Sequence, residues 1–178
     1  MLRFLHLADL HLGAAFDMLS QKAAESAQQK QFAALEHAVR VAGRERAHAI
    51  LIAGDLFDSP LPSATVFSRA MSILSQAACP VLIAPGNHDH ICAGSPYLTS
   101  ALPSNVHVFT QSTLEPVHLG EAATVWGAAF HLSLIHILPM TQPARMIVPG
   151  RITVPAPITA SGAIYTLSGA KICTPAAM

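Results

Sequence analysis

Short runs of mostly apolar residues recur along the chain and predict three buried strands. The runs are Phe4–Ala8, Ala49–Ala53 and Val81–Ala84. Runs without a regular polar alternation are typical of strands that are buried on both faces, as in a parallel sheet. Polar residues follow each run at once, so each predicted strand ends in a polar loop.

The residues between the first two runs follow a helical period. They predict an amphipathic helix over at least Gln28–Ala47. Its apolar positions are Phe32, Leu35, Val39 and Ala42. We expect its polar residues to lie nearer solvent, namely Gln31, Glu36, Arg40 and Arg44.

A second helix is predicted between the second and third runs. Prolines break the chain at Pro60 and Pro62, and Ser63 can then cap the helix. The predicted buried stripe consists of Val66, Ala70, Ile73, Leu74 and Ala77.

The order strand, helix, strand, helix, strand predicts an α/β fold with parallel strands and right-handed crossovers. The carboxyl ends of parallel strands lie at one edge of a sheet, so the polar loops should meet there. Further along, Asn105–Phe109, Leu114–Leu119 and Thr124–Ala128 are predicted as short strands. The last two can form a hairpin through Gly120 and Glu121.

Composition narrows the class of protein. The 178 residues suffice for one domain with a substantial core, and 52% apolar residues indicate a globular protein. The formal net charge is zero, so no overall basic field points to nucleic acid. No apolar run could span a bilayer, and Asp9 and His11 interrupt the apolar start, which predicts a strand rather than a leader. Cys79, Cys92 and Cys173 are odd in number and lack metal-type spacing, so we expect a reducing cytoplasm.

The pattern changes near His131. All ten acidic residues lie at or before Glu121, whereas the last 47 residues contain six of the thirteen prolines. We therefore expect a domain over residues 1–131 and an irregular tail over residues 132–178. A sharper hypothesis is that the native reading frame ends near His131, because the peptide Leu132-Ser133-Leu134-Ile135-His136-Ile137 resembles translated sequencing-adaptor sequence. Resequencing the source DNA across codon 131 decides between them.

The polar loops carry residues that can bind metal ions. Two divalent ions about 3.5–4 Å apart can hold a phosphate and activate water at neutral pH. Asp55 is the candidate bridge, because a carboxylate has two oxygens. Asp9 and His11 would add ligands to one ion, and Asn87 to the other. Mixed carboxylate, imidazole and amide ligation suits manganese, iron or zinc.

His88 and Asp58 are the candidate catalytic residues. His88 directly follows the predicted ligand Asn87, and its ring can protonate a leaving oxygen or stabilise charge on a phosphate. Asp58 lies three residues after Asp55 and can orient His88 through the second ring nitrogen.

Three motifs resemble the first signature blocks of the calcineurin-like metallophosphoesterases. They are Asp9-Leu10-His11, Gly54-Asp55-Leu56-Phe57-Asp58 and Gly86-Asn87-His88-Asp89. The residues around them are most similar to the SbcD-type DNA-repair exonuclease branch. This resemblance covers about residues 1–131. It implies an α/β/β/α sandwich, two Mn²⁺ ions, DNA as substrate and a partner ATPase of the SbcC type.

The same resemblance predicts an incomplete site. Members of the family add later histidine blocks, commonly Gly-His and Gly-His-x-His, and no Gly-His pair occurs in this chain. His131 and His136 stand in other contexts. The first ion would have three protein ligands and the second two. We therefore expect a sandwich that is incomplete at the C-terminus, weak metal loading and little activity for this chain alone.

These observations leave three functions open. The leading hypothesis is metal-dependent hydrolysis of phosphodiesters by a DNA exonuclease. Hydrolysis of small phosphomonoesters or phosphodiesters is the alternative, because the sequence has no pronounced basic patch. A non-catalytic scaffold for an ATPase is the third. The sequence does not fix the oligomeric state, so a homodimer stays open, and no membrane partner is expected.

Overall fold

The main sheet contains the three predicted strands in parallel order. The computed structural model describes residues 2–121, 123–131, 146–147, 152–153 and 163–167. The parallel strands are β1 (Leu2–Leu7), β2 (Ala49–Ala53), β3 (Val81–Ala84) and β4 (Val106–Val108). They pair in the order β4-β3-β2-β1. This arrangement confirms the predicted parallel α/β topology.

Short strands from the last part of the chain extend both sheets. β9 (Ala163–Leu167) pairs antiparallel with β1, and β8 (Ile152–Thr153) pairs with β9. β7 (Met146–Ile147) joins a second sheet. The rest of residues 132–178 lies outside the described part of the chain, so the hypotheses about this tail stay predictions.

Helix α1 (Gln21–Arg44) starts earlier than the minimum range predicted and ends three residues before Ala47. Its end is a Schellman motif, in which the N–H of Ala47 donates to the carbonyl of Ala42 over 2.8 Å. Arg46 takes the left-handed conformation this motif requires, with φ of 52°. Glycine usually fills this position, so the sequence carried no stop signal there.

Helix α2 (Ala64–Leu74) begins at the predicted cap, where the Ser63 side chain accepts a hydrogen bond from the N–H of Val66. Three residues of the predicted stripe are buried, and Val66 and Ala77 are partly buried. Phe67 and Met71 are buried as well, which widens the stripe. A short helix, α3 (Pro96–Thr99), follows the loop after β3.

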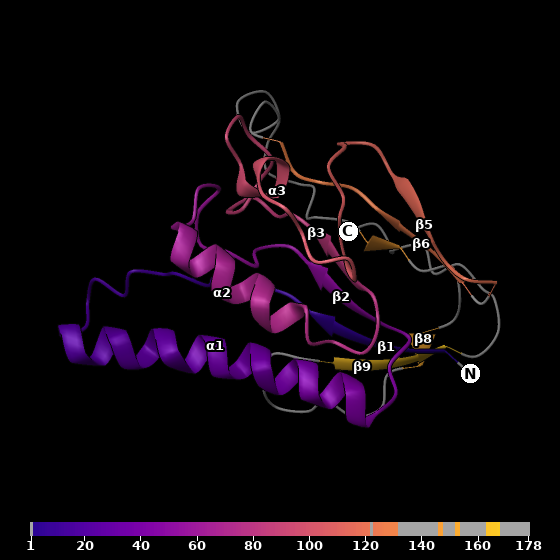
Figure 1. Cartoon of the computed structure of the whole chain (residues 1–178), viewed down its shortest axis with the longest axis horizontal. Coiled ribbons are helices and arrows are strands. Elements are labelled where there is room, and N and C mark those ends of the chain that lie inside the picture. The colour runs from indigo at the N-terminus through magenta and orange to yellow at the C-terminus, as the bar shows by residue number, and fades with distance from the viewer. Residues whose placement is uncertain (1, 122, 132–145, 148–151, 154–162, 168–178) are drawn as a thin grey trace, which may run out of the picture.

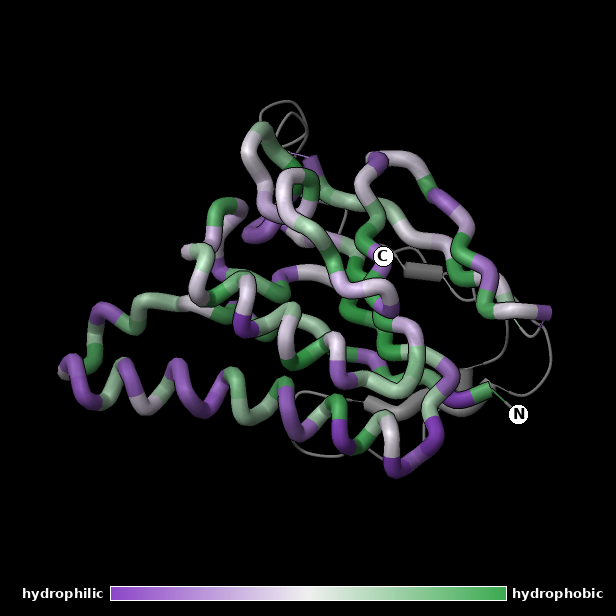
Figure 2. The backbone as a smooth tube through the Cα atoms, in the orientation of Figure 1, coloured by the Kyte–Doolittle hydropathy of each residue, from purple (hydrophilic) through white to green (hydrophobic). Residues whose placement is uncertain are grey.

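The two helices and the second sheet cover opposite faces of the main sheet (Figure 1). Alternate side chains of the strands point to the two sides, as the pleat of a sheet requires. Leu5, Ile50 and Ile52 belong to the core on the helix side, whereas Phe4 and Leu51 belong to the core on the other side. Figure 2 shows the hydrophobic central strands and the mixed polarity of α1.

The second sheet contains the predicted hairpin. β5 (Glu115–Leu119) and β6 (Ala123–Gly127) pair antiparallel, with Gly120 at a φ of 59° in the turn. Val125 is fully buried against the main sheet, whereas Trp126 points the other way and is 37% exposed. The predicted α/β class is therefore confirmed, and the described layers are helices, main sheet and small sheet.

The predicted four-layer sandwich implies a second helical layer on the far side of the small sheet. That layer falls outside the residues that the structure describes. Within the described ranges, no helix is both long enough and apolar enough to cross a membrane.

Candidate metal centre

The loops after β1 and β2 run side by side at the carboxyl edge of the main sheet. Backbone hydrogen bonds join them like a short parallel ladder. The N–H of Asp9 donates to the carbonyl of Gly54 over 3.2 Å, and the N–H of His11 donates to the carbonyl of Asp55 over 2.9 Å. Leu12 and Phe57 then form an isolated parallel bridge. The ladder places the two loops in fixed register beyond the ends of their strands.

Three of the predicted ligands have left-handed backbones. The φ angles are 54° for Asp9, 47° for His11 and 54° for Asp55. Residues other than glycine rarely adopt this region, and such conformations persist only where the surrounding structure enforces them. Each turn of the backbone re-aims a side chain away from the regular alternation of a strand. Three of the five non-glycine residues with positive φ in the described part of the chain are therefore residues expected to bind metal ions.

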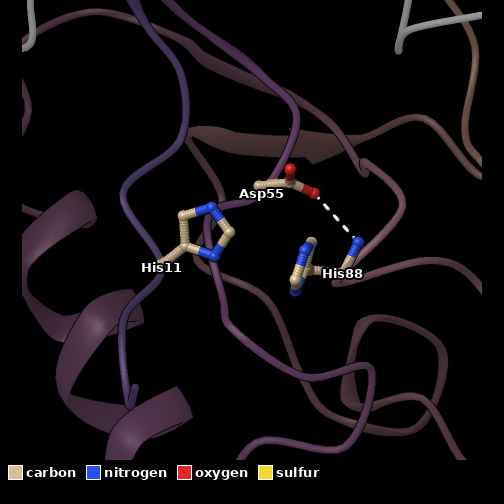
Figure 3. Close-up of side chains that lie close together, drawn as sticks. All are labelled: His11, Asp55 and His88. Atoms are coloured by element: carbon tan, nitrogen blue, oxygen red, sulfur yellow. Dashed lines mark hydrogen bonds between the residues drawn. The ribbon is translucent and has the colours of Figure 1, made fainter. Parts of the chain in front are cut away.

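His11, Asp55 and His88 converge at this edge (Figure 3). One ligand-type atom from each lies within 4.8 Å of the others. The N–H of His88 donates to Asp55 Oδ1 over 2.9 Å, which fixes that carboxylate against the loop after β3. The two imidazole rings are edge to face, with centroids 4.7 Å apart. The His11 imidazole and the Asp55 carboxylate are donors of the kind that manganese, iron and zinc ions bind, and His88 lies beside them.

Asp58 lies beside both histidines, but it is closer to His11. Its Oδ1 is 3.0 Å from His11 Nδ1 and 3.9 Å from His88 Nδ1. The second distance is too long for a hydrogen bond. A carboxylate at Nδ1 leaves Nε2 of His11 as the nitrogen for a metal ion. The predicted pairing of Asp58 with His88 is thus a looser contact than its pairing with His11.

Asp9 and Asn87 lie at the edges of this cluster. Asp9 is exposed, and among the described residues the group of converging His, Cys, Asp and Glu side chains does not include it. Asn87 is also exposed, next to His88 in the loop after β3, and its carbonyl is 2.9 Å from His90 Nδ1. The metal roles of Asp9 and Asn87 stay predictions.

Asp89 is a buried residue whose role the sequence reasoning missed. It is 1% exposed, and its carboxylate lies beneath the loops that carry Asp55 and His88. The motif after β3 contains Asp89, but no local pattern distinguishes a buried carboxylate from a loop acid. The signal that the sequence does hold is its position directly after two site residues.

The Asp89 carboxylate receives a hydrogen bond from the buried Tyr97 hydroxyl over 2.8 Å. Burial raises the pKa of Asp89, while hydrogen bonds from Tyr97, Gly86 and Phe57 act in the opposite direction. Burial and the charge of Asp89 raise the pKa of Tyr97 well above its usual value. The Tyr97 hydroxyl therefore stays protonated and remains a donor at physiological pH.

Two glutamines of α1 support the loop after β1. Gln31 Nε2 donates to the carbonyls of His11 over 2.8 Å and Leu10 over 3.2 Å. Gln28 Nε2 donates to the carbonyl of Ala14 over 2.9 Å. The helical pattern predicts Gln31 nearer solvent, whereas it turns inward to the loop. The two glutamines are three positions apart and so share one side of the helix, a spacing that could have indicated a common contact.

Comparison with known proteins places this chain in a family. Residues 2–148 match the calcineurin-like phosphoesterase family. A subunit of the nuclease SbcCD from Bacillus subtilis is 31% identical over 141 residues, which cover 72% of this chain and 34% of that protein. The DNA double-strand break repair protein Mre11 of Aeropyrum pernix is 38% identical over 90 residues, which cover 49% of this chain and 21% of that protein.

Two further matches extend the comparison. The uncharacterized metallophosphoesterase YhaO of Bacillus subtilis is 32% identical over 120 residues, which cover 64% of this chain and 29% of that protein. A dimetal phosphatase structure from Danio rerio overlaps 49% of this chain and 30% of its own, with 20% identity and a TM-score of 0.37. The chain thus spans about a third or less of the curated relatives it matches. The family match, by contrast, covers most of this chain. The chain belongs to the calcineurin-like phosphoesterases.

Proposed function

We propose that this chain carries part of a metal-dependent phosphoesterase site that hydrolyses phosphodiesters. The observation that carries the proposal is the convergence of His11, Asp55 and His88 within 4.8 Å at the carboxyl edge of the main sheet. Membership in the calcineurin-like phosphoesterases supports the same chemistry. These side chains lie where parallel strands end together. α/β proteins bind their substrates at this edge of the sheet.

The proposed ligand set uses the residues named from the sequence. Asp9 and His11 would hold one ion, Asn87 the other, and Asp55 both. When bound, a pair of divalent ions holds the phosphate and lowers the pKa of an attacking water. Asp55 suits the shared position because it is 8% exposed and fixed at Oδ1 by the N–H of His88. Its backbone conformation is enforced on both sides, so its side chain has little freedom to turn away.

His88 is the proposed proton donor to the leaving oxygen. Its side chain is 46% exposed, so a substrate can reach the ring from solvent. Asp58 lies near enough to stabilise the protonated ring, and it bonds more closely to the proposed ligand His11. Loss of the His88 imidazole should therefore reduce turnover more than metal binding.

DNA is the proposed substrate, Mn²⁺ the proposed ion and an SbcC-type ATPase the proposed partner, in the cytoplasm. The support is similarity to one protein named as part of the nuclease SbcCD and another named as a DNA double-strand break repair protein. A second candidate is the hydrolysis of small phosphoesters. It is favoured by a formal net charge of zero, because proteins that bind the phosphate backbone of DNA usually carry a basic surface.

Substitution of Asp55 tests the proposal. Mn²⁺ binding is measured by electron paramagnetic resonance, and hydrolysis is measured on bis-p-nitrophenyl phosphate and on linear DNA. The assays use this chain and a version continued to the length of its relatives. Asp55→Ala should weaken Mn²⁺ binding by about 100-fold and abolish hydrolysis, because it removes the carboxylate that both ions share.

Glu121→Gln is the matched control, because it removes one carboxylate from the exposed turn of the small sheet. It should behave as the wild type. Equal Mn²⁺ binding by wild type and Asp55→Ala would contradict the proposed site. Cleavage of the small diester without cleavage of DNA in the longer version would favour the second candidate. If the chain is a non-catalytic scaffold, the Asp55→Ala variant should still bind the ATPase partner. Neither the wild type nor any variant should then hydrolyse a substrate.

A further inference from the structure

The carboxylate of Asp89 joins the two loops that carry Asp55 and His88. We propose that Asp89, held by Tyr97, is a positioning residue that sets Asp55 and the loop after β3 at the separation that metal binding requires. This inference rests on the proposed metal site and deepens it. Asp89 has no contact with substrate in this role and acts through the backbone of its neighbours.

Each oxygen of Asp89 has its own set of donors. Oδ1 accepts from the N–H of Asp55 over 3.2 Å and from the N–H of Gly86 over 2.6 Å, so it connects the ends of β2 and β3 directly. Oδ2 accepts from the N–H of Leu56 over 3.1 Å and from the hydroxyl of Tyr97 over 2.8 Å. A single carboxylate therefore gathers donors from two strand ends and one helix.

The backbone after β2 is held from both sides. The carbonyls of Asp55 and Leu56 accept from the loop after β1, over 2.9 Å in each case. Their N–H groups turn the other way and donate to Asp89. Buried N–H groups without a partner are costly, so loss of Asp89 would favour a rearranged loop. Because Asp55 lies in this loop with a left-handed backbone, rearrangement moves the proposed bridging ligand.

The Tyr97 hydroxyl holds Oδ2 of Asp89 through a hydrogen bond. The Tyr97 ring is 5% exposed and packs against Phe57 and Phe67, with centroid distances of 5.8 and 6.0 Å. The hydroxyl is thus delivered by a buried aromatic cluster rather than by a mobile surface side chain. Tyr97→Phe removes only this hydrogen bond and leaves the ring in place.

Four variants of this chain test the proposal. Asp89→Asn replaces an oxygen with an amide group that cannot accept, and Tyr97→Phe removes the hydroxyl. Leu74→Ala is the control for lost stability, because Leu74 is a fully buried residue of α2 and is not one of the site residues named above. Asp55→Ala is the control for lost metal binding.

Mn²⁺ affinity is measured by electron paramagnetic resonance at a temperature where circular dichroism shows each variant folded. We expect Asp89→Asn to weaken Mn²⁺ binding about 10-fold or more, the usual size for partners that orient metal ligands. Tyr97→Phe should weaken it about threefold, since one hydrogen bond is lost. Leu74→Ala should lower the melting temperature and leave affinity unchanged. The amide resonances of Leu56 and Gly86 should shift in Asp89→Asn and Tyr97→Phe without metal.

The outcomes separate this proposal from the proposed function. Wild-type affinity in a folded Asp89→Asn overturns the positioning role while the metal site stands. If Asp89→Asn does not fold, Tyr97→Phe decides: weaker binding supports the proposal, and unchanged binding overturns it. Wild-type protein that binds no Mn²⁺, or binds it equally in Asp55→Ala, overturns the proposed function and this inference with it.

Discussion

The loop after β1 and the loop after β3 reach the same edge of the main sheet, but they are held by different chemistry. Neutral side-chain amides of Gln28 and Gln31 hold the first loop, in partly exposed surroundings. The charged carboxylate of Asp89 holds the second loop from a buried position. Water can replace an amide at a partly exposed carbonyl, whereas nothing replaces a buried carboxylate. The second loop should therefore be the less tolerant of change.

Gly86→Ala should produce the largest loss of Mn²⁺ affinity, because Gly86 lies in the less tolerant loop, the one after β3. A Cβ at position 86 would overlap Asp55 Oδ1 and lie 2.6 Å from the backbone nitrogen of Asp55. Asp55 would have to move, so we expect Mn²⁺ affinity to fall by about 100-fold, at the upper end for changes around metal ligands. Isothermal titration calorimetry measures the change.

Gly43→Ala is the matched control for this substitution. A Cβ at Gly43 in α1 would have nothing within 4 Å. It should leave Mn²⁺ affinity unchanged and stabilise the helix by about 0.5–1 kcal/mol. Equal affinities in the two variants would show that the approach of Gly86 to Asp55 has no bearing on the site.

Gln31→Ala should have a moderate effect, since it acts on the more tolerant loop. It removes hydrogen bonds to the carbonyls of Leu10 and His11, and water can reach part of this region. We expect a loss of about 1 kcal/mol in the free energy of unfolding and about threefold in Mn²⁺ affinity. Gln29→Ala, an exposed position on the same helix, is the control. If Gln31→Ala lowered Mn²⁺ affinity as much as Gly86→Ala does, the two loops would not differ in their tolerance of change.

Acidification should give the smallest effect, and it concerns β1. Burial lowers the pKa of His6 below its ordinary value of 6.5, while the charge of Asp9 acts in the opposite direction. The unfolded chain therefore takes up the proton first, so stability is full above pH 6.5 and declines as pH falls toward the lowered pKa. His6→Gln should flatten the decline of the melting temperature between pH 7 and 5. The exposed His37→Gln should not, and an unchanged decline in His6→Gln would contradict the assignment.

The fold could be predicted because its strands and helices are recorded locally in the sequence. Mostly apolar runs marked β1, β2 and β3, and helical spacing marked α1 and α2. The parallel order followed from the connections alone. The parallel order also predicted that Asp9, His11, Asp55, Asn87 and His88 would share one edge. The structure brings His11, Asp55 and His88 together there.

The supports of the site could not be predicted in the same way. Asp89 accepts from the backbone of Asp55 and Leu56, 34 and 33 residues away, and Gln31 donates to carbonyls 20 and 21 residues away. No local period records such distant contacts. Helical periodicity identifies which side of α1 is apolar, but it does not distinguish a polar residue in solvent from one that reaches a loop. The preference of Asp58 for His11 over His88 depends on less than 1 Å, which only coordinates can give.

Trp126, the chain's only tryptophan, lies on the small sheet, across the main sheet from the helices. Its fluorescence therefore reports on one face of the molecule, while far-ultraviolet ellipticity is dominated by α1 and α2 on the other. The fold thus supplies two optical probes without any label. Coincident melting curves from both would mean that the two faces come apart as one cooperative unit, and separate curves would mean that the hairpin detaches by itself.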